Sequence, residues 1–168
     1  MKTYEFGNVD SDIILIQPVD DHDLEGIENE FAKIANSCDL NVHLMAVRIN
    51  NWNDDLSPWE APAVFGKEKF GGGASTTLCD LMKLCNDKEK KYYIGGYSLA
   101  GLFALWAAYQ TDIFEGVAAA SPSMWFPGFD DYMKKNEIKT DTVYLSLGNR
   151  EEKARNPVMA TVGDRIRG

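Results

Sequence analysis

Near the middle of this 168-residue chain, a single serine separates a predicted strand from a predicted helix. Residues 91–97 form the strand pattern, and residues 99–109 are apolar nearly all round, as expected for a helix packed in the middle of a fold. The residues two before and two after Ser98 are Gly96 and Ala100. A very tight strand-to-helix turn requires small residues at both positions, because they approach each other closely. The segment therefore predicts an α/β fold in which Ser98 occupies a strained turn.

Strand and helix patterns alternate along the rest of the chain. Further strands are predicted at residues 13–16, 41–49, 114–120 and 142–147. Helices are predicted at residues 24–35, from a Ser75 cap to Cys85, as a short helix or turn at residues 130–136, and from Asn156-Pro157 onward. This order predicts one domain over residues 1–168, an α/β sandwich around a mostly parallel sheet of about five strands.

A long segment without a regular pattern, residues 50–73, joins the second strand to the next helix. Loops of this length in compact domains are usually functional or disordered. Its tryptophans, Trp52 and Trp59, favour packing over disorder. We expect Trp59, together with Trp52 and with Trp125 from a later loop, to line a substrate pocket at the carboxyl edge of the sheet. Packing in the core is the alternative for each of these side chains.

The predicted turn suits Ser98 to nucleophilic chemistry. A nucleophile elbow lifts the serine Oγ clear of the sheet, and the free N–H groups of the following helix can bind a developing oxyanion. Leu99 is the expected first donor, and Val19, which follows a proline that cannot donate, is the expected second. An ordinary tight turn is one alternative. A phosphate-binding loop is less favoured, because neither glycine run precedes a Lys-Ser/Thr pair and no G-x-G-x-x-G occurs.

Composition excludes several classes of partner. The formal net charge of -9 disfavours nucleic acid and anionic membranes, because both would repel the chain. The N-terminus has no signal-peptide pattern, and the three cysteines lack C-x-x-C spacing, so we expect reduced thiols and a cytoplasmic location. Two histidines are too few for a His-rich metal site. We expect neither a metal nor a cofactor.

The elbow also carries a family resemblance. Residues 95–105, Gly-Gly-Tyr-Ser-Leu-Ala-Gly-Leu-Phe-Ala-Leu, resemble the elbow of bacterial esterases of the α/β-hydrolase superfamily that are related to the esterase D and enterochelin esterase group. Residues 52–59, 70–74 and 120–125 are also similar to that group, and the resemblance covers nearly the whole chain. It implies an α/β-hydrolase-type three-layer sandwich, a small-molecule ester as substrate, and hydrolysis through an acyl-enzyme on Ser98.

The other members of the expected triad are harder to find. In this superfamily an acid and then a histidine follow the serine along the chain. The resemblance implies Glu151 as the acid and Glu152 as the second choice, although both could be solvated loop charges. No histidine follows them, so we expect the family's C-terminal strand and helix to be missing and activity to be impaired. His43 is expected to be structural within a buried strand, and His22 to be a solvated loop residue at the elbow's edge of the sheet.

A second hypothesis needs no catalysis. The chain would then be an inactive hydrolase-fold remnant that binds a small molecule or another protein. A missing C-terminal strand would leave a sheet edge uncovered, which predicts a homodimer through that edge.

Overall fold

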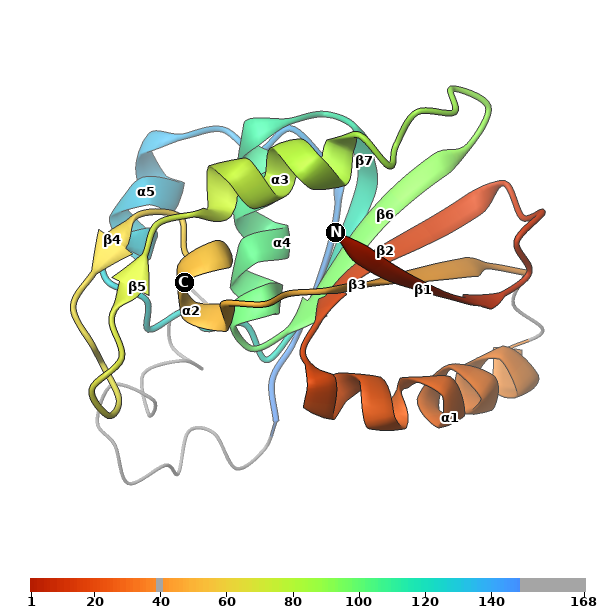
Figure 1. The fold of residues 1–168 in the computed structure, drawn as a ribbon. Coiled ribbons are helices and arrows are strands. Elements are labelled where there is room, and N and C mark those ends of the chain that lie inside the picture. Colours follow the sequence, from red (N-terminus) through yellow and green to blue (C-terminus); the bar gives the residue numbers. More distant parts are fainter. Residues whose placement is uncertain (39–40, 149–168) are drawn as a thin grey trace.

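One mixed sheet organises the molecule. The computed structural model describes residues 1–38 and 41–148. Within them, six strands lie in the order β1-β3-β2-β6-β7-β8 (Figure 1). They are β1 (Lys2–Gly7), β2 (Ile13–Val19), β3 (His43–Arg48), β6 (Lys91–Tyr97), β7 (Phe114–Ala120) and β8 (Thr142–Ser146). Strand β1 pairs antiparallel with β3, and the other pairs are parallel. The predicted α/β fold with a mostly parallel sheet is confirmed.

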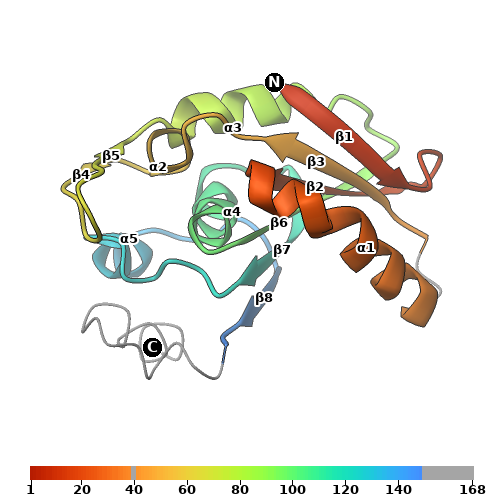
Figure 2. The same cartoon turned by 60° about the horizontal axis from the view of Figure 1, so that its bottom comes forward.

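Helices cover both faces of the sheet. Helix α1 (Asp21–Cys38) packs on one face, where Val19, Ile27 and Leu44 form a small core cluster. Helices α3 (Ala74–Met82) and α4 (Leu99–Gln110) lie on the opposite face, over the main core (Figures 1 and 2). Every residue of α4 from Leu99 to Ala108 is buried, as its apolar pattern predicts. No helix within residues 1–38 and 41–148 has the length and apolar character needed to cross a membrane.

The predicted strands at 91–97 and 114–120 match β6 and β7 residue for residue. The first predicted strand was expected to end before Pro18, but β2 continues to Val19. Proline is tolerated there because the pairing of β2 with β6 ends at Ile16, so no acceptor on that side needs an N–H from Pro18. Strand β1, the sixth, was missed because none of its residues is fully buried and its sequence gives no continuous apolar run.

The start of α3 differs from the prediction. Its N-cap is Gly73, and Ser75 lies inside the helix. The Gly73 N–H donates to the Asp54 carbonyl at 2.7 Å, and a Cβ on Gly73 would lie 2.8 Å from that same oxygen. The helix therefore begins where a glycine permits close contact with the preceding loop.

The segment at residues 50–73 is ordered by short elements of its own. It contains α2 (Trp52–Asp55) and a small hairpin of β4 (Glu60–Ala61) and β5 (Phe70–Gly71). The fully buried Ser57 hydroxyl accepts the Gly72 N–H at 2.8 Å and donates to the Asp54 carbonyl at 3.3 Å. These bonds tie the hairpin to α2.

Two of the three cysteines lie near α3 and are free thiols. The helix ends at Met82, so Cys85 lies beyond it rather than within it as predicted. Burial raises the pKa of the Cys85 thiol to about 12, whereas Cys79 is exposed. Because the thiolate is the reactive form, iodoacetamide at mildly alkaline pH should alkylate Cys79 at least about tenfold faster than Cys85. Peptide mass spectrometry of the native chain measures this ratio. Equal native rates would contradict it, and unfolding in urea should bring the two rates together.

Candidate active site

Ser98 stands at the carboxyl end of β6, directly before α4, in a strained conformation. Its backbone has φ 58° and ψ -119°. Among residues 1–38 and 41–148, only Ser98 and Ser121 combine a side chain with a positive φ. Such a conformation costs on the order of 1–3 kcal/mol and persists only when its surroundings enforce it. The turn has the backbone geometry that the sequence predicts for an elbow.

The small residues around Ser98 are required by contact. A Cβ on Gly96 would lie 2.5 Å from the backbone carbon and oxygen of Ala100. A Cβ on Gly101 would lie 3.1 Å from the Gly96 carbonyl oxygen and 3.2 Å from that of Ala120. Strand, helix and the end of β7 therefore meet at this turn with no space for side chains.

Four hydrogen bonds fix Ser98. Its N–H donates to the Ala120 carbonyl at 3.0 Å, and its carbonyl accepts from the N–H groups of Leu102 at 3.1 Å and Ser123 at 3.0 Å. Its hydroxyl lies 3.3 Å from the Ser123 hydroxyl. Residues 120–125 carry part of the family resemblance, but their sequence alone assigns Ser123 no role. One sequence feature could have indicated Ser123: it follows shortly after a predicted strand whose carboxyl end lies at the same edge of the sheet as the elbow.

The two expected oxyanion donors lie on different elements. Leu99 is the first residue of α4, where helix geometry leaves the N–H without an intrahelical acceptor. Val19 is the last residue of β2, with its side chain fully buried against α1 and its carbonyl accepting the Ile49 N–H at 2.9 Å. Val19 is therefore strand rather than loop. The oxyanion roles of both residues stay predictions.

The two histidines lie at opposite edges of the sheet. His43 is 6% exposed and begins β3, with its Nε2 3.7 Å from a Glu5 carboxylate oxygen. In the sheet, Ile14 of β2 pairs with His43 on one side and with Tyr92 of β6 on the other, so His43 and Tyr92 lie at the same height along the strands. Tyr92 comes six residues before Ser98 in the sequence. At about 3.3 Å per residue, His43 is roughly 20 Å from the elbow along the strands. Its predicted burial in a strand is confirmed.

His22 is exposed in the first turn of α1, which begins just after β2. It therefore lies at the carboxyl edge, as predicted, but in a helix rather than in the predicted loop. Next to it, Asp21 accepts two hydrogen bonds from the Arg48 guanidinium, at 2.5 and 2.9 Å, and this interaction lowers the pKa of the Asp21 carboxyl. Among the described residues, the hydrogen-bond partner of the Ser98 hydroxyl is Ser123 and not a histidine. Glu151 and Glu152, and the predicted last helix, lie outside the described residues.

Two of the three tryptophans expected in a substrate pocket, Trp59 and Trp125, take part in aromatic packing. Trp59 donates from Nε1 to the Pro127 carbonyl at 2.9 Å, and its ring lies 5.4 Å from Tyr132 and 5.5 Å from Phe126. Trp125 is 8% exposed and packs edge-on against Phe65, with ring centroids 4.6 Å apart. Their substrate-binding roles stay predictions.

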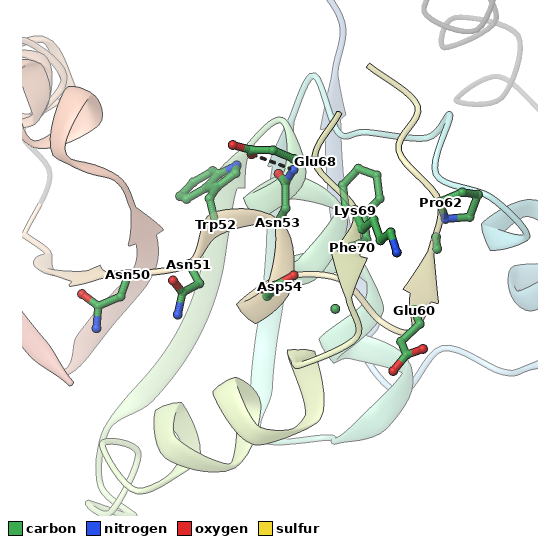
Figure 3. Close-up of a pocket in the computed structure, with 12 residues that line it drawn as sticks. Asn50, Asn51, Trp52, Asn53, Asp54, Glu60, Pro62, Glu68, Lys69 and Phe70 are labelled. Atoms are coloured by element: carbon green, nitrogen blue, oxygen red, sulfur yellow. Dashed lines mark hydrogen bonds between the residues drawn. The ribbon is translucent and has the colours of Figure 1, made fainter. Parts of the chain in front are cut away.

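An open cavity of about 1030 Å³ lies between α2 and the β4–β5 hairpin. Figure 3 shows amide, carboxylate and aromatic groups facing it from both sides, with Asn53 donating to Glu68 at 3.4 Å. Trp52 lines it, whereas Trp59 and Trp125 are not among its lining residues. Because Asn50 and Asn51 directly follow β3, one end of this cavity is at the carboxyl edge where Ser98 lies.

Comparison with known proteins shows which solved structures share this arrangement of strands and helices. No protein-family model and no curated protein sequence matches the chain. Solved structures do match. The siderophore hydrolase EstA from Aspergillus nidulans is 17% identical over 91% of this chain and 66% of its own, with a TM-score of 0.60. The enterochelin esterase from Shigella flexneri is 14% identical over 98% of this chain and 44% of its own, with a TM-score of 0.61.

An alpha-beta serine hydrolase homologue from Coxiella burnetii is 11% identical over 98% of this chain and 89% of its own, with a TM-score of 0.50. The chain thus spans between about two fifths and two thirds of the length of the siderophore hydrolase and the enterochelin esterase. At these identities the shared property is the arrangement of strands and helices. From its sheet order, its strained serine turn and these matches, the chain has the α/β-hydrolase fold.

Proposed function

We propose that this protein is a serine hydrolase that cleaves small-molecule carboxylic esters through an acyl-enzyme on Ser98. The observation that carries the proposal is the backbone of Ser98, with φ 58° at a strand-to-helix turn closed by Gly96 and Ala100. A strained serine at the carboxyl edge of a parallel sheet is the arrangement that presents a nucleophile. Two of the matched structures are a siderophore hydrolase and an enterochelin esterase, which supports an ester as substrate.

The chemistry follows from the parts present. The Ser98 Oγ attacks the ester carbonyl, and the resulting oxyanion is stabilised by the Leu99 N–H at the start of α4, with Val19 as the second donor. Collapse of this intermediate breaks the bond to the leaving alcohol and leaves the acyl group on Ser98. Water then attacks the acyl-enzyme and releases the acid. Neither metal nor cofactor is needed for these steps.

A base must accept the Ser98 proton as Oγ attacks and pass it to the leaving alcohol oxygen as the intermediate collapses. Glu151 would orient a histidine, but no histidine follows it in the sequence. His22 is the one histidine at the same sheet edge. We therefore expect the 168-residue chain to be a slow catalyst on its own. We also assign it to the cytoplasm, because its cysteines suit a reducing compartment.

A fluorophosphonate probe tests the nucleophile directly, because phosphonylation requires a reactive hydroxyl but no turnover. With imidazole supplied as the base, we expect the probe to label a single serine, Ser98, as located by peptide mass spectrometry. The Ser98→Ala variant should stay unlabelled. Labelling of Ser75, an exposed serine of α3, to the same extent as Ser98 would refute a special reactivity at the elbow.

A second candidate function, binding without catalysis, is favoured by the exposure of β8. This strand is outermost among the described strands, and its Val143 and Tyr144 are 38% and 63% exposed. An apolar outer strand offers unpaired backbone groups and apolar surface to another chain. A second copy of this chain is the partner that we propose for it.

Self-association through β8 gives a measurable prediction. At high micromolar concentration, light scattering after size exclusion should report a dimer. Val143→Lys should shift it to monomer, because a lysine on an outer strand opposes pairing. Thr76→Lys, which adds the same charge at an exposed position of α3, should leave the dimer intact. A monomer at all concentrations would remove this candidate.

A further inference from the structure

Ser123 is a buried serine in contact with the hydroxyl of Ser98. It lies in the loop after β7 and is 1% exposed, yet its Oγ is 3.3 Å from the Ser98 Oγ. Ser98 itself is partly exposed. The partly exposed Ser98 hydroxyl, which a substrate can reach, is therefore in contact with the Ser123 hydroxyl, which is buried inside the protein.

The backbone holds this contact from several directions. The Ser123 N–H donates to the Ser98 carbonyl at 3.0 Å, and the Ser98 N–H donates to the Ala120 carbonyl at 3.0 Å. The Ser123 carbonyl in turn accepts the Phe126 N–H at 3.0 Å. These bonds fix both backbones and keep the two side chains next to each other, so the rotamers of the two serines decide whether their hydroxyls meet.

The two loop residues before Ser123 also contact the outer strand and the elbow. Ser121, with φ 42°, donates its N–H to the Ser146 carbonyl at 2.7 Å, and its hydroxyl accepts the Gly148 N–H at 3.2 Å. Pro122 packs so closely on the elbow that a Cβ on Gly101 would lie 3.2 Å from its Cα. The strained backbone of Ser121 thus occurs where the loop after β7 packs closely against the Ser98 turn.

A hydroxyl in this position has one clear use. Serine χ1 has three staggered wells, and an exposed serine without a partner exchanges among them. A buried hydroxyl must find a hydrogen-bond partner, and within the described residues Ser123 finds it in Ser98. The contact therefore favours the one Ser98 rotamer that points to Ser123.

We propose that Ser123 is a positioning residue: its buried hydroxyl holds the Ser98 Oγ in a single rotamer and so prepares it for attack on the ester. This inference rests on the proposed function for its catalytic meaning. When Ser123 donates to the Ser98 Oγ, the Ser98 proton remains free to pass to a base. No bond to Ser123 forms or breaks during the reaction.

Two readouts test the proposal on the full 168-residue chain. The first is the Hα–Hβ coupling constants of Ser98, measured by NMR with labelled serine, which report its χ1. We expect the wild type to show one rotamer and Ser123→Ala to show an average over several. Ser123→Thr, which keeps the hydroxyl, should restore the single rotamer if it folds. Ser11→Ala is the matched control, because Ser11 is also a buried, hydrogen-bonded serine but lies at the amino edge of β2.

The second readout is Ser98-dependent ester hydrolysis, measured with imidazole supplied as a base. Ser123→Ala should lower kcat about tenfold, which corresponds to about 1.4 kcal/mol, with KM unchanged. Ser11→Ala should change neither constant. A single Ser98 rotamer in Ser123→Ala would overturn the positioning role, and so would an unchanged kcat. Absence of any Ser98-dependent rate in the wild type would instead contradict the proposed function, and the coupling constants would still decide the role of Ser123.

Discussion

Hydrolysis of p-nitrophenyl butyrate by this chain is expected to depend wholly on Ser98 and to rise when imidazole is added. Ser98 is positioned and partly exposed, but its hydroxyl partner among the described residues is another serine rather than a base. In an intact triad, loss of the histidine costs about as much as loss of the whole triad, roughly 10⁶ in kcat. An external imidazole that reaches Ser98 can act as the base and should restore a small part of the lost rate. We expect it to increase the Ser98-dependent rate at least about tenfold.

The measurement must separate this rate from hydrolysis by imidazole itself. Ser98→Ala provides that background, because it keeps the fold and lacks the nucleophile, and its rate should equal that of buffered imidazole alone. Ser75→Ala is the control for loss of a serine away from the elbow and should behave as wild type. Intact-mass analysis should find one butyryl group on the wild type and none on Ser98→Ala. Equal rates in wild type and Ser98→Ala at every imidazole concentration would rule out hydrolysis through Ser98.

His22 is the internal alternative to added imidazole. A Ser98-dependent rate without imidazole would indicate a base that is already present, and His22→Gln should then remove it. If that rate survives in His22→Gln, the base must come from another group or from a second copy of the chain.

The elbow was predictable because its constraints are local. A tight turn between strand and helix demands small residues at fixed offsets, and Gly96 and Ala100 show this in the sequence. The strands flanking it, β6 and β7, are central in the sheet and therefore give clear apolar patterns. Strand β1 lies at the outside of the sheet and gives no such pattern.

What the sequence could not provide was contact between distant segments. Ser123 lies 25 positions from Ser98, and only the return of the chain along β7 brings the two hydroxyls together. Gly73 caps α3 because of a carbonyl on α2, which no pattern near Ser75 indicates. Likewise, the packing of Trp59 against Phe126 and Tyr132 depends on a loop that lies far along the chain.

Gly96→Ala should be the most destabilising single-methyl change in the elbow. The added Cβ would lie 2.5 Å from backbone atoms of Ala100, which belong to the buried part of α4 and cannot move aside as a flexible side chain would. Overpacking of this kind costs typically 1–3 kcal/mol and occasionally more, and contact with backbone puts Gly96 at the upper end, about 3 kcal/mol. Urea unfolding followed by far-UV circular dichroism measures the loss.

Gly26→Ala is the matched comparison, because it makes the same change inside α1 where the nearest atom to the new Cβ is a Glu30 carboxylate oxygen at 3.8 Å. A helix interior favours alanine over glycine by roughly 0.5–1 kcal/mol, so this variant should be more stable than wild type. A lower free energy of unfolding for Gly96→Ala and a higher one for Gly26→Ala would show that Gly96 is required by close contact and not by general flexibility. If Gly96→Ala unfolds at the wild-type urea concentration, the turn is not closed as tightly as its geometry requires, and the strain argument for Ser98 as a presented nucleophile falls with it.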